Sequence, residues 1–375
     1  MSSVSADNLS DGTGKREDGY LQLEDGSLFP GKLFGSGSPA DGEVVFNTGM
    51  VGYPESLTDP SYRGQILAFT YPLIGNYGVP HFEKGSPHFE SDDIQVRGVI
   101  LSSLSWDRGH HKADLNLHEW MASRNICGIE GIDTRRLTKI LRERGTMLGR
   151  IVGEGGEGKA FSVNDPAKGD LVEEVSVKET ESIRPESDER AHVILIDCGC
   201  KRSIINNLRT RGVRITRVPY DADISDMKCD GIMISNGPGD PGILKRTIEN
   251  VKKTMEADPI KPVAGICLGS QIMALAAGGQ TYKLRFGHRS QNQPCNLVGT
   301  EKCVITSQNH GYAVDESSLP DGWKVWYRNM NDGSVEGIEH GEDPFFSVQF
   351  HPEASPGPTD SSGFFDSFLE VISRG

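Results

Sequence analysis

Short apolar runs alternate with amphipathic segments in the second half of the chain, from residue 191 onward. Buried strands are predicted at 192–197, 213–218, 231–235 and 262–266, and helices at 203–211 and 243–255. Strands and helices that alternate in this way form a parallel sheet with helices on both faces. We therefore expect residues 191–375 to form a doubly wound, mostly parallel α/β domain.

The pattern in residues 19–152 differs, because its apolar runs are short and close together. Strands are predicted at 20–23, 27–29, 43–46, 65–70 and 96–101, the first two joined by a hairpin turn at Asp25 and Gly26. Helices are predicted at 115–121 and directly after Asp133 or Thr134, whose side chains can cap a helix. We expect these residues to form a separate, β-rich α/β domain.

Two further stretches lack these patterns. Residues 1–18 are rich in Ser, Asp and Gly and contain no apolar segment, so they predict a disordered tail and no signal or transit peptide. Residues 153–190 contain clustered glycines and more acidic than basic side chains. That composition predicts an acidic linker, with a short strand at 171–177.

Composition narrows the possible partners and the compartment. The chain has 375 residues, 53 acidic and 39 basic, and its net charge of −14 argues against a nucleic-acid partner. Its seven cysteines include no Cys-x-x-Cys pair, so we expect free thiols in a reducing compartment and no metal site. Cys198 and Cys200 could form a redox or metal pair, but their place at the end of a predicted buried strand favours packing. No apolar stretch reaches the roughly 18 residues of a membrane span, and we expect a cytoplasmic protein with no membrane partner.

Cys267 lies in the segment GICLGSQ at 265–271, between an apolar run and a helix-like segment. A strand that turns sharply into a helix at a reactive side chain is a nucleophile elbow, here with a thiol. Gly265 and Gly269 provide the small neighbours that such a strained turn requires. The start of the following helix favours the thiolate. Cys267 is therefore the candidate nucleophile.

His351 and Glu353 follow the strand predicted at 345–350. A histidine can accept the thiol proton, and a carboxylate two residues later can fix its tautomer and stabilise its charged form. Alone, a His-Pro-Glu tripeptide is more often a surface turn and a cysteine more often a core residue. At the strand ends of one α/β domain, where functional residues gather, Cys267, His351 and Glu353 together predict a catalytic triad.

A turn with the sequence NGPGDP at 236–241 follows another predicted strand. The simpler interpretation is a tight turn. Beside a nucleophile elbow, however, such a backbone can point an N–H group at a developing oxyanion, together with the N–H of Leu268.

A second glycine-rich segment, at 153–158, lacks the Gly-Lys-Ser/Thr ending of a phosphate-binding loop, so no such loop is predicted there.

The motifs at 236–241, 265–269 and 351–353 resemble those of the class I, triad-type glutamine amidotransferases. The segments at 308–315 and 346–358 narrow the resemblance to the small, glutaminase chain of carbamoyl-phosphate synthase. The segments at 42–48, 52–55, 57–62 and 131–135 are similar to the N-terminal domain of that chain. The resemblance extends from about residue 20 to the end.

This resemblance implies an activity and a set of site residues. Cys267 would attack the side-chain carboxamide of L-glutamine, His351 would move the proton to the leaving ammonia, and Glu353 would orient His351. The N–H groups of Leu268 and Gly239 would form the oxyanion hole. Glutamine would be bound by Ser61, Gly237, Gly239, Leu268, Gln271, Asn309, Gly311 and Tyr312.

The resemblance also implies a partner. Because ATP-binding motifs are lacking, ATP and Mg are expected on a separate carbamoyl-phosphate synthase large chain, and no cofactor is expected in this chain. Ammonia would pass to the large chain in a hetero-oligomer, with the N-terminal domain as the docking surface. The carbamoyl phosphate would serve pyrimidine or arginine biosynthesis.

Ser270 departs from the family pattern, in which a histidine usually occupies this position. A serine here either packs behind the nucleophile without consequence or slows glutamine hydrolysis. Because the triad is complete, we expect activity, with Ser270 tuning its rate. Three alternatives stay open: a weak or silent assembly subunit, a class I amidotransferase that serves another synthetase, and a free-standing thiol hydrolase acting on another amide.

Overall fold

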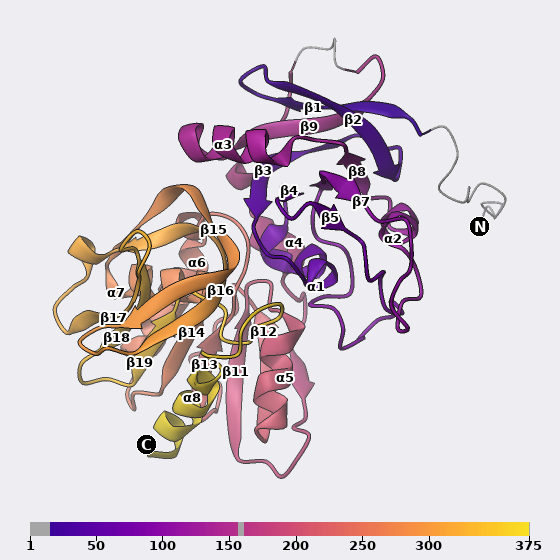
Figure 1. The fold of residues 1–375 in the computed structure, drawn as a ribbon. Coiled ribbons are helices and arrows are strands. Elements are labelled where there is room, and N and C mark those ends of the chain that lie inside the picture. Colours follow the sequence, from indigo (N-terminus) through magenta and orange to yellow (C-terminus); the bar gives the residue numbers. More distant parts are fainter. Residues whose placement is uncertain (1–15, 157–160, 375) are drawn as a thin grey trace. The chain divides into compact units, whose positions relative to one another are not determined.

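The structure is a computed structural model that describes residues 16–156 and 161–374. The chain forms two compact units, and each has its own sheet (Figure 1). The first comprises residues up to Asn47 together with Gly64–His88 and Asp92–Pro166. The second comprises Thr48–Arg63, Phe89–Ser91 and the residues from Ala167 onward. Most of the tail expected at 1–18 lies outside the described residues.

The first unit contains a closed barrel whose seven strands follow the order β1-β2-β8-β6-β4-β3-β9. The strands are β1 (Asp18–Leu23), β2 (Leu28–Gly35), β3 (Ala40–Asn47), β4 (Gln65–Phe69), β6 (Gly98–Ile100), β8 (Cys127–Glu130) and β9 (Met147–Gly153). β1 and β2 pair antiparallel across the predicted hairpin turn, in which Gly26 has a φ of 85°. Leu21 and Leu23 are fully buried while Gln22 between them is partly exposed, as the two-residue period of a strand requires.

Two helices of the first unit confirm the sequence predictions, with small shifts at their ends. In α2 (Leu117–Ser123), Asn116 and Glu119 form a reciprocal capping box. In α3 (Thr134–Arg144), the Asp133 side chain accepts the backbone N–H of Arg136, and Gly145 ends the helix with a φ of 99°. A small parallel pair, β5 (Leu73–Ile74) and β7 (Ser103–Leu104), completes this unit.

The second unit contains one ten-stranded sheet with the order β10-β12-β11-β13-β14-β19-β18-β17-β15-β16. Its parallel part consists of β12 (Val213–Pro219), β11 (Ala191–Asp197), β13 (Gly231–Ile234), β14 (Val263–Ile266) and β19 (Phe345–Val348). Its antiparallel strands are β10 (Glu181–Ile183), β18 (Val335–His340), β17 (Trp323–Asn329), β15 (Gln280–Leu297) and β16 (Cys303–Asp315). The predicted parallel sheet is confirmed for five adjacent strands.

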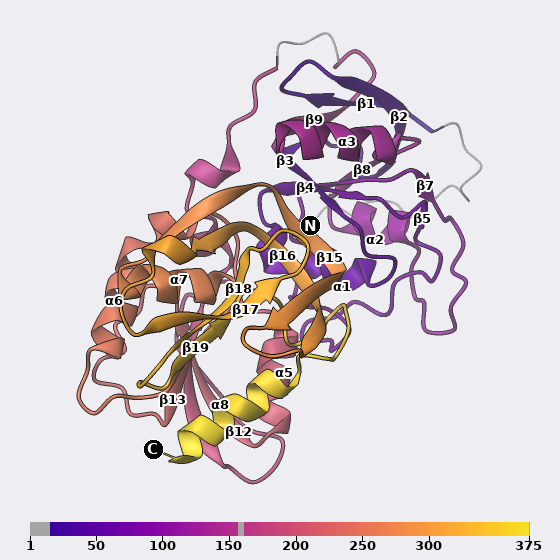
Figure 2. The same ribbon diagram turned by 60° about the vertical axis from the view of Figure 1, so that its left-hand side comes forward.

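Helices cover both faces of the parallel strands, as predicted (Figure 2). On one face, α5 (Arg202–Thr210) and α8 (Gly363–Arg374) pack against inward-pointing residues such as Val193 and Leu195. On the other, α6 (Lys245–Met255) and α7 (Leu268–Ala277) pack against Ile194 and Ile196. Successive residues of β11 thus point into two separate hydrophobic cores. A short helix, α1 (Tyr53–Thr58), also belongs to this unit.

The strand predicted at 171–177 is wrong, because this segment begins with a helix, α4 (Leu171–Val175). The Asp170 side chain accepts the backbone N–H of Glu173 and caps the first turn, while Leu171 and Val172 are buried. The cap therefore decides the local structure over the β-branched residues. No helix within residues 16–156 and 161–374 is long and apolar enough to cross a membrane.

Candidate active site

Cys267 occupies the sharp turn between β14 and α7. Its φ of 55° and ψ of −104° are unusual for a residue with a side chain. The neighbouring glycines are required, because a Cβ atom at Gly269 would lie 2.2 Å from the Ile234 carbonyl oxygen. The N–H of Leu268 is at the first position of α7, where no intrahelical partner exists. The turn therefore places a buried thiol beside the N–H groups at the start of α7.

His351 and Glu353 lie just beyond the end of β19, the parallel neighbour of β14 in the sheet. The backbone N–H of Cys267 donates to the Val348 carbonyl, which ties the elbow to the end of β19. The His351 Nδ1 atom lies 2.6 Å from Glu353 Oε1, and the side chains of both residues are buried. Because a carboxylate only accepts, Nδ1 carries a proton, and in the neutral imidazole Nε2 is the free base.

Electrostatics favour a charged His351. Burial alone lowers the pKa of this imidazole, but the charge of Glu353 and the nearby Cys267 sulfur outweigh burial and raise it. His351 Nε2 is buried and has no hydrogen-bond partner among the described residues. In the structure the Cys267 thiol donates to the Asn309 carbonyl oxygen, with the two atoms 3.6 Å apart. The arrangement is suited to moving a proton between sulfur and the imidazole.

Lys201, which the sequence analysis missed, completes the electrostatic arrangement behind the imidazole. Its Nζ lies 2.8 Å from Glu353 Oε1 and also donates to the Ser355 carbonyl oxygen at 2.5 Å. Burial raises the pKa of Glu353, but the charges of Lys201 and His351 outweigh it and lower that pKa to about 2. The one sequence feature that could have indicated a role for Lys201 is its position shortly after β11, at the carboxyl edge of the parallel strands.

The loop that follows β13 packs against the elbow. A Cβ atom at Gly237 would lie 2.0 Å from the Cys198 carbonyl oxygen and 2.8 Å from the Leu268 side chain, so only glycine fits. Gly239 has a φ of 88°, the left-handed region that glycine adopts at no steric cost. The Asn236 side chain, fully buried, accepts the backbone N–H of Lys201. The loop is thus fixed against both β11 and α7.

Two segments far apart in the sequence meet beside this loop. The Asn236 amide donates to Ser61 Oγ at 2.9 Å, and Ser61 lies in the 3₁₀ turn Pro60–Tyr62. Asp59 accepts the backbone N–H of Ser61 with one oxygen and the side-chain amide of Asn309 with the other. Ser61 and Asn309 are therefore held together by one carboxylate.

The remaining predicted residues lie on α7 and β16. The Gln271 amide donates to the Tyr312 carbonyl oxygen and to Gln349 Oε1, each at 3.0 Å. Gly311 lies between Asn309 and Tyr312 on β16. Direct contacts thus connect most of the predicted residues, whereas Gly239 and Gly311 are placed by their chain neighbours. Ser270 is buried and its Oγ lies 2.8 Å from Ser347 Oγ in β19.

Comparisons with known proteins cover both units. Residues 194–371 match the family described as "Glutamine amidotransferase class-I", and residues 21–151 match "Carbamoyl-phosphate synthase small chain, CPSase domain". The carbamoyl phosphate synthase arginine-specific small chain of Aspergillus fumigatus is 46% identical over 94% of this chain and 79% of that protein. The corresponding small chain of Neurospora crassa is 47% identical over 93% of this chain and 79% of that protein. The multifunctional protein CAD of Squalus acanthias is 49% identical over 93% of this chain, which spans only 16% of that protein.

Proposed function

Because this chain belongs to the family of carbamoyl-phosphate synthase small chains, we propose that it is the glutaminase of such a synthase. It hydrolyses L-glutamine and supplies ammonia to a large chain that makes carbamoyl phosphate. The observation that carries the proposal is the buried series Lys201, Glu353 and His351 at the strand end next to Cys267. A surface turn would need no such ion pairs.

The reaction begins at sulfur. His351 Nε2 accepts the thiol proton, and Cys267 Sγ attacks the carboxamide carbon of glutamine, which forms a C–S bond and a negatively charged oxygen. The N–H groups of Leu268 and Gly239 stabilise that oxygen, and each such donor lowers the barrier by roughly 3 kcal/mol. The imidazolium then gives its proton to the leaving nitrogen, the C–N bond breaks, and ammonia departs.

Hydrolysis of the thioester repeats the same proton transfers with water as the nucleophile. His351 accepts a proton from water, hydroxide adds to the thioester carbon, and the C–S bond breaks as the imidazolium gives that proton to the departing Cys267 sulfur. The thiol is thereby restored, and glutamate leaves after its new carboxyl group loses its proton to solvent. Glu353 holds the imidazole in one tautomer throughout, and Lys201 keeps Glu353 ionised. Each group is therefore returned to its starting protonation state.

The proposed glutamine site surrounds the elbow. Its residues are Ser61, Gly237, Gly239, Leu268, Gln271, Asn309, Gly311 and Tyr312. The contacts that support it are those through Asp59, which fixes Ser61 and Asn309, and through Gln271, which fixes the Tyr312 backbone. Small residues in the loop after β13 leave backbone N–H groups as the available donors.

The proposed partner is the carbamoyl-phosphate synthase large chain, in a hetero-oligomer to which this chain delivers ammonia. ATP and Mg are assigned to that large chain. A class I amidotransferase domain is typically independent of cofactors, and the chemistry above uses only side chains and backbone of this chain. We expect this protein alone to hydrolyse glutamine slowly and to be stimulated by the large chain.

A reconstitution experiment tests this function. Carbamoyl phosphate formation is measured with a large chain of this family, with glutamine or ammonia as nitrogen donor. Cys267→Ser should abolish glutamine-dependent synthesis and leave ammonia-dependent synthesis unchanged, while the exposed Cys303→Ser serves as the matched control. Full glutamine-dependent synthesis by Cys267→Ser would refute the proposal.

The second candidate is a silent assembly subunit, which the serine at position 270 favours. Covalent labelling decides between the two. A glutamine-analogue electrophile should modify Cys267 of the isolated wild-type chain, and protection by glutamine should slow the labelling. A chain that stimulates ammonia-dependent synthesis but is not labelled would be an assembly subunit.

A further inference from the structure

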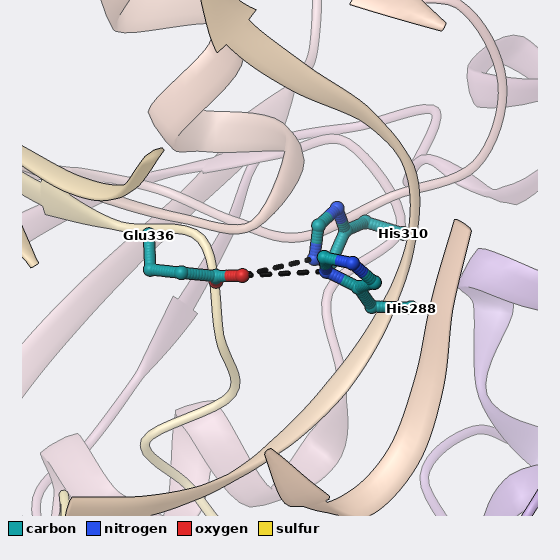
Figure 3. Close-up of side chains that lie close together, drawn as sticks. All are labelled: His288, His310 and Glu336. Atoms are coloured by element: carbon teal, nitrogen blue, oxygen red, sulfur yellow. Dashed lines mark ion pairs between the residues drawn. The ribbon is translucent and has the colours of Figure 1, made fainter. Parts of the chain in front are cut away.

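Three buried side chains with metal-binding atoms converge in the antiparallel part of the second unit (Figure 3). They are His288 from β15, His310 from β16 and Glu336 from β18, and one ligand atom from each lies within 4.8 Å of the others. Both imidazoles point toward the carboxylate. His288 Nδ1 lies 3.3 Å from Glu336 Oε1, and His310 Nε2 lies 3.9 Å from the same oxygen.

The protonation of each imidazole follows from its other neighbour. His288 Nε2 lies 2.8 Å from Asp332 Oδ2, and His310 Nδ1 lies 2.8 Å from the Tyr312 carbonyl oxygen. Carboxylate and carbonyl oxygens only accept hydrogen bonds, so these two nitrogens carry the protons. The nitrogen of each ring that faces Glu336 is therefore the one with a lone pair in the neutral imidazole.

Donors among the described residues reach only one oxygen at the centre of the cluster. Glu336 Oε1 accepts the Asn329 amide at 3.0 Å and the Ser334 hydroxyl at 3.5 Å, but Glu336 Oε2 and His288 Nδ1 are buried without a hydrogen-bond partner. Gln308 directs its amide nitrogen to Thr306 and its Oε1 to His310 Nε2 at 3.2 Å. With both imidazoles neutral, lone pairs of two imidazoles, one carboxylate and one amide face each other, which is unfavourable unless a cation or proton lies between them.

We propose that His288, His310 and Glu336 bind a divalent transition-metal ion of the zinc type, with Gln308 Oε1 as the nearest further oxygen. Imidazole nitrogen and carboxylate oxygen are established zinc ligands, and bonds near 2.1 Å place tetrahedral ligands about 3.4 Å apart. The separations of 3.3 and 3.9 Å come close to this value. Each histidine also donates its second ring N–H to an oxygen acceptor, the usual outer-shell arrangement of metal-binding histidines.

The sequence predicts no metal site, because its cysteines do not form a Cys-x-x-Cys pair. This site instead uses single residues of three strands, and sheet register brings them together: His288 is directly opposite His310 in the pairing of β15 with β16. The bound ion would fix the segment of β16 that contains Asn309 and Tyr312. An effect on the KM for glutamine would follow, and that effect alone rests on the proposed function.

A metal titration tests the proposal. The tag-free full chain is stripped with a chelator, dialysed and titrated with Co²⁺ followed by Zn²⁺. We expect one Co²⁺ per chain with visible absorption bands, no thiolate charge-transfer band, and displacement by Zn²⁺. Glu336→Gln should weaken binding by more than about 100-fold and Asp332→Asn by roughly 10- to 100-fold. Glu339→Gln, on the same strand and paired with Lys324 at the surface, is the matched control and should bind as wild type.

The competing arrangement needs no metal. A proton on His288 Nδ1 and a reversed Gln308 amide would satisfy the same lone pairs. That arrangement predicts a wild-type chain that binds no stoichiometric Co²⁺ or Zn²⁺, and this result would overturn the proposal. Thiolate charge-transfer bands, or unchanged affinity in Glu336→Gln, would also overturn it. If Glu336→Gln does not fold, Asp332→Asn, which retains all three ligands, decides the matter by the same titration.

Discussion

Replacement of Lys201 by Met should strongly destabilise the second unit, because it removes the partner of a buried carboxylate. Lys201 Nζ lies 2.8 Å from Glu353 Oε1, and the two side chains are 3% and 0% exposed. Removal of one member of such a buried pair costs roughly 3–5 kcal/mol of unfolding free energy. The matched control is Lys324→Met, because Lys324 lies 3.1 Å from Glu339 but is 62% exposed. An exposed pair contributes less than about 1 kcal/mol.

The expected loss of unfolding free energy in Lys201→Met depends on pH, and the pKa of Glu353 determines the direction of this dependence. In the wild type the pKa of Glu353 is lowered to about 2, so its ionised form stabilises the fold fully above pH 4.5 and loses this effect only as pH falls toward 2. Without Lys201, the effect of burial is opposed only by His351, and the pKa of Glu353 should rise. The variant should therefore lose least stability, relative to wild type, at acidic pH. Urea unfolding of the wild type and the variant at pH 7 and pH 5 measures the loss of unfolding free energy at each pH.

A double variant separates the ion pair from the rest of the Lys201 environment. If Lys201 acts through Glu353, the variant Lys201→Met with Glu353→Gln should be more stable than either single variant, since no uncompensated charge remains. Glutamine hydrolysis should stay low in Glu353→Gln and in the double variant, because in both the imidazole of His351 has lost its anionic partner. Equal losses for Lys201→Met and Lys324→Met at pH 7, or strictly additive losses in the double variant, would refute this reasoning.

Further predictions concern the elbow, the rate and a helix cap. Gly269→Ala should abolish glutamine hydrolysis, because the added Cβ would lie 2.2 Å from the Ile234 carbonyl oxygen and distort the elbow. Steady-state kinetics of the folded variant measure this loss, and wild-type activity would contradict the prediction. Ser270→His should change the kcat for glutamine, and identical kinetics would remove the rate-tuning hypothesis. Asp133→Ala removes the N-cap of α3, so it should lower the unfolding free energy of the first unit by about 1 kcal/mol and leave glutamine hydrolysis unchanged. Lower hydrolysis at unchanged stability would show that capping is not the main role of Asp133.

Local signals made the elbow predictable from the sequence. Cys267 is flanked by an apolar strand, two glycines and a helix, and each of these features acts on the turn through neighbours in the chain. His351 and Glu353 were predictable because they follow a buried strand at the functional edge of a parallel sheet. The positions of these three residues are thus determined by the sequence immediately around them.

Other parts depend on contacts between distant segments. Lys201 acts through a carboxylate far away in the chain, and a lysine is rarely buried, so nothing near it in the sequence marks its role. β15 is eighteen residues long, contains register shifts and lacks a clear alternation of apolar and polar residues, so neither this strand nor the cluster at His288 was predicted. At α4, the cap at Asp170 outweighed the strand preference of valine.

The central claim, that glutamine is hydrolysed through a thioester on Cys267, is tested most directly by mass spectrometry of the acid-quenched protein. The complex with a large chain is mixed with glutamine, quenched during turnover and digested. The account predicts a glutamyl adduct on the peptide that contains Cys267, and none in Cys267→Ser. Glutamine hydrolysis at the wild-type rate by Cys267→Ser, or an adduct on a different cysteine during turnover, would contradict it.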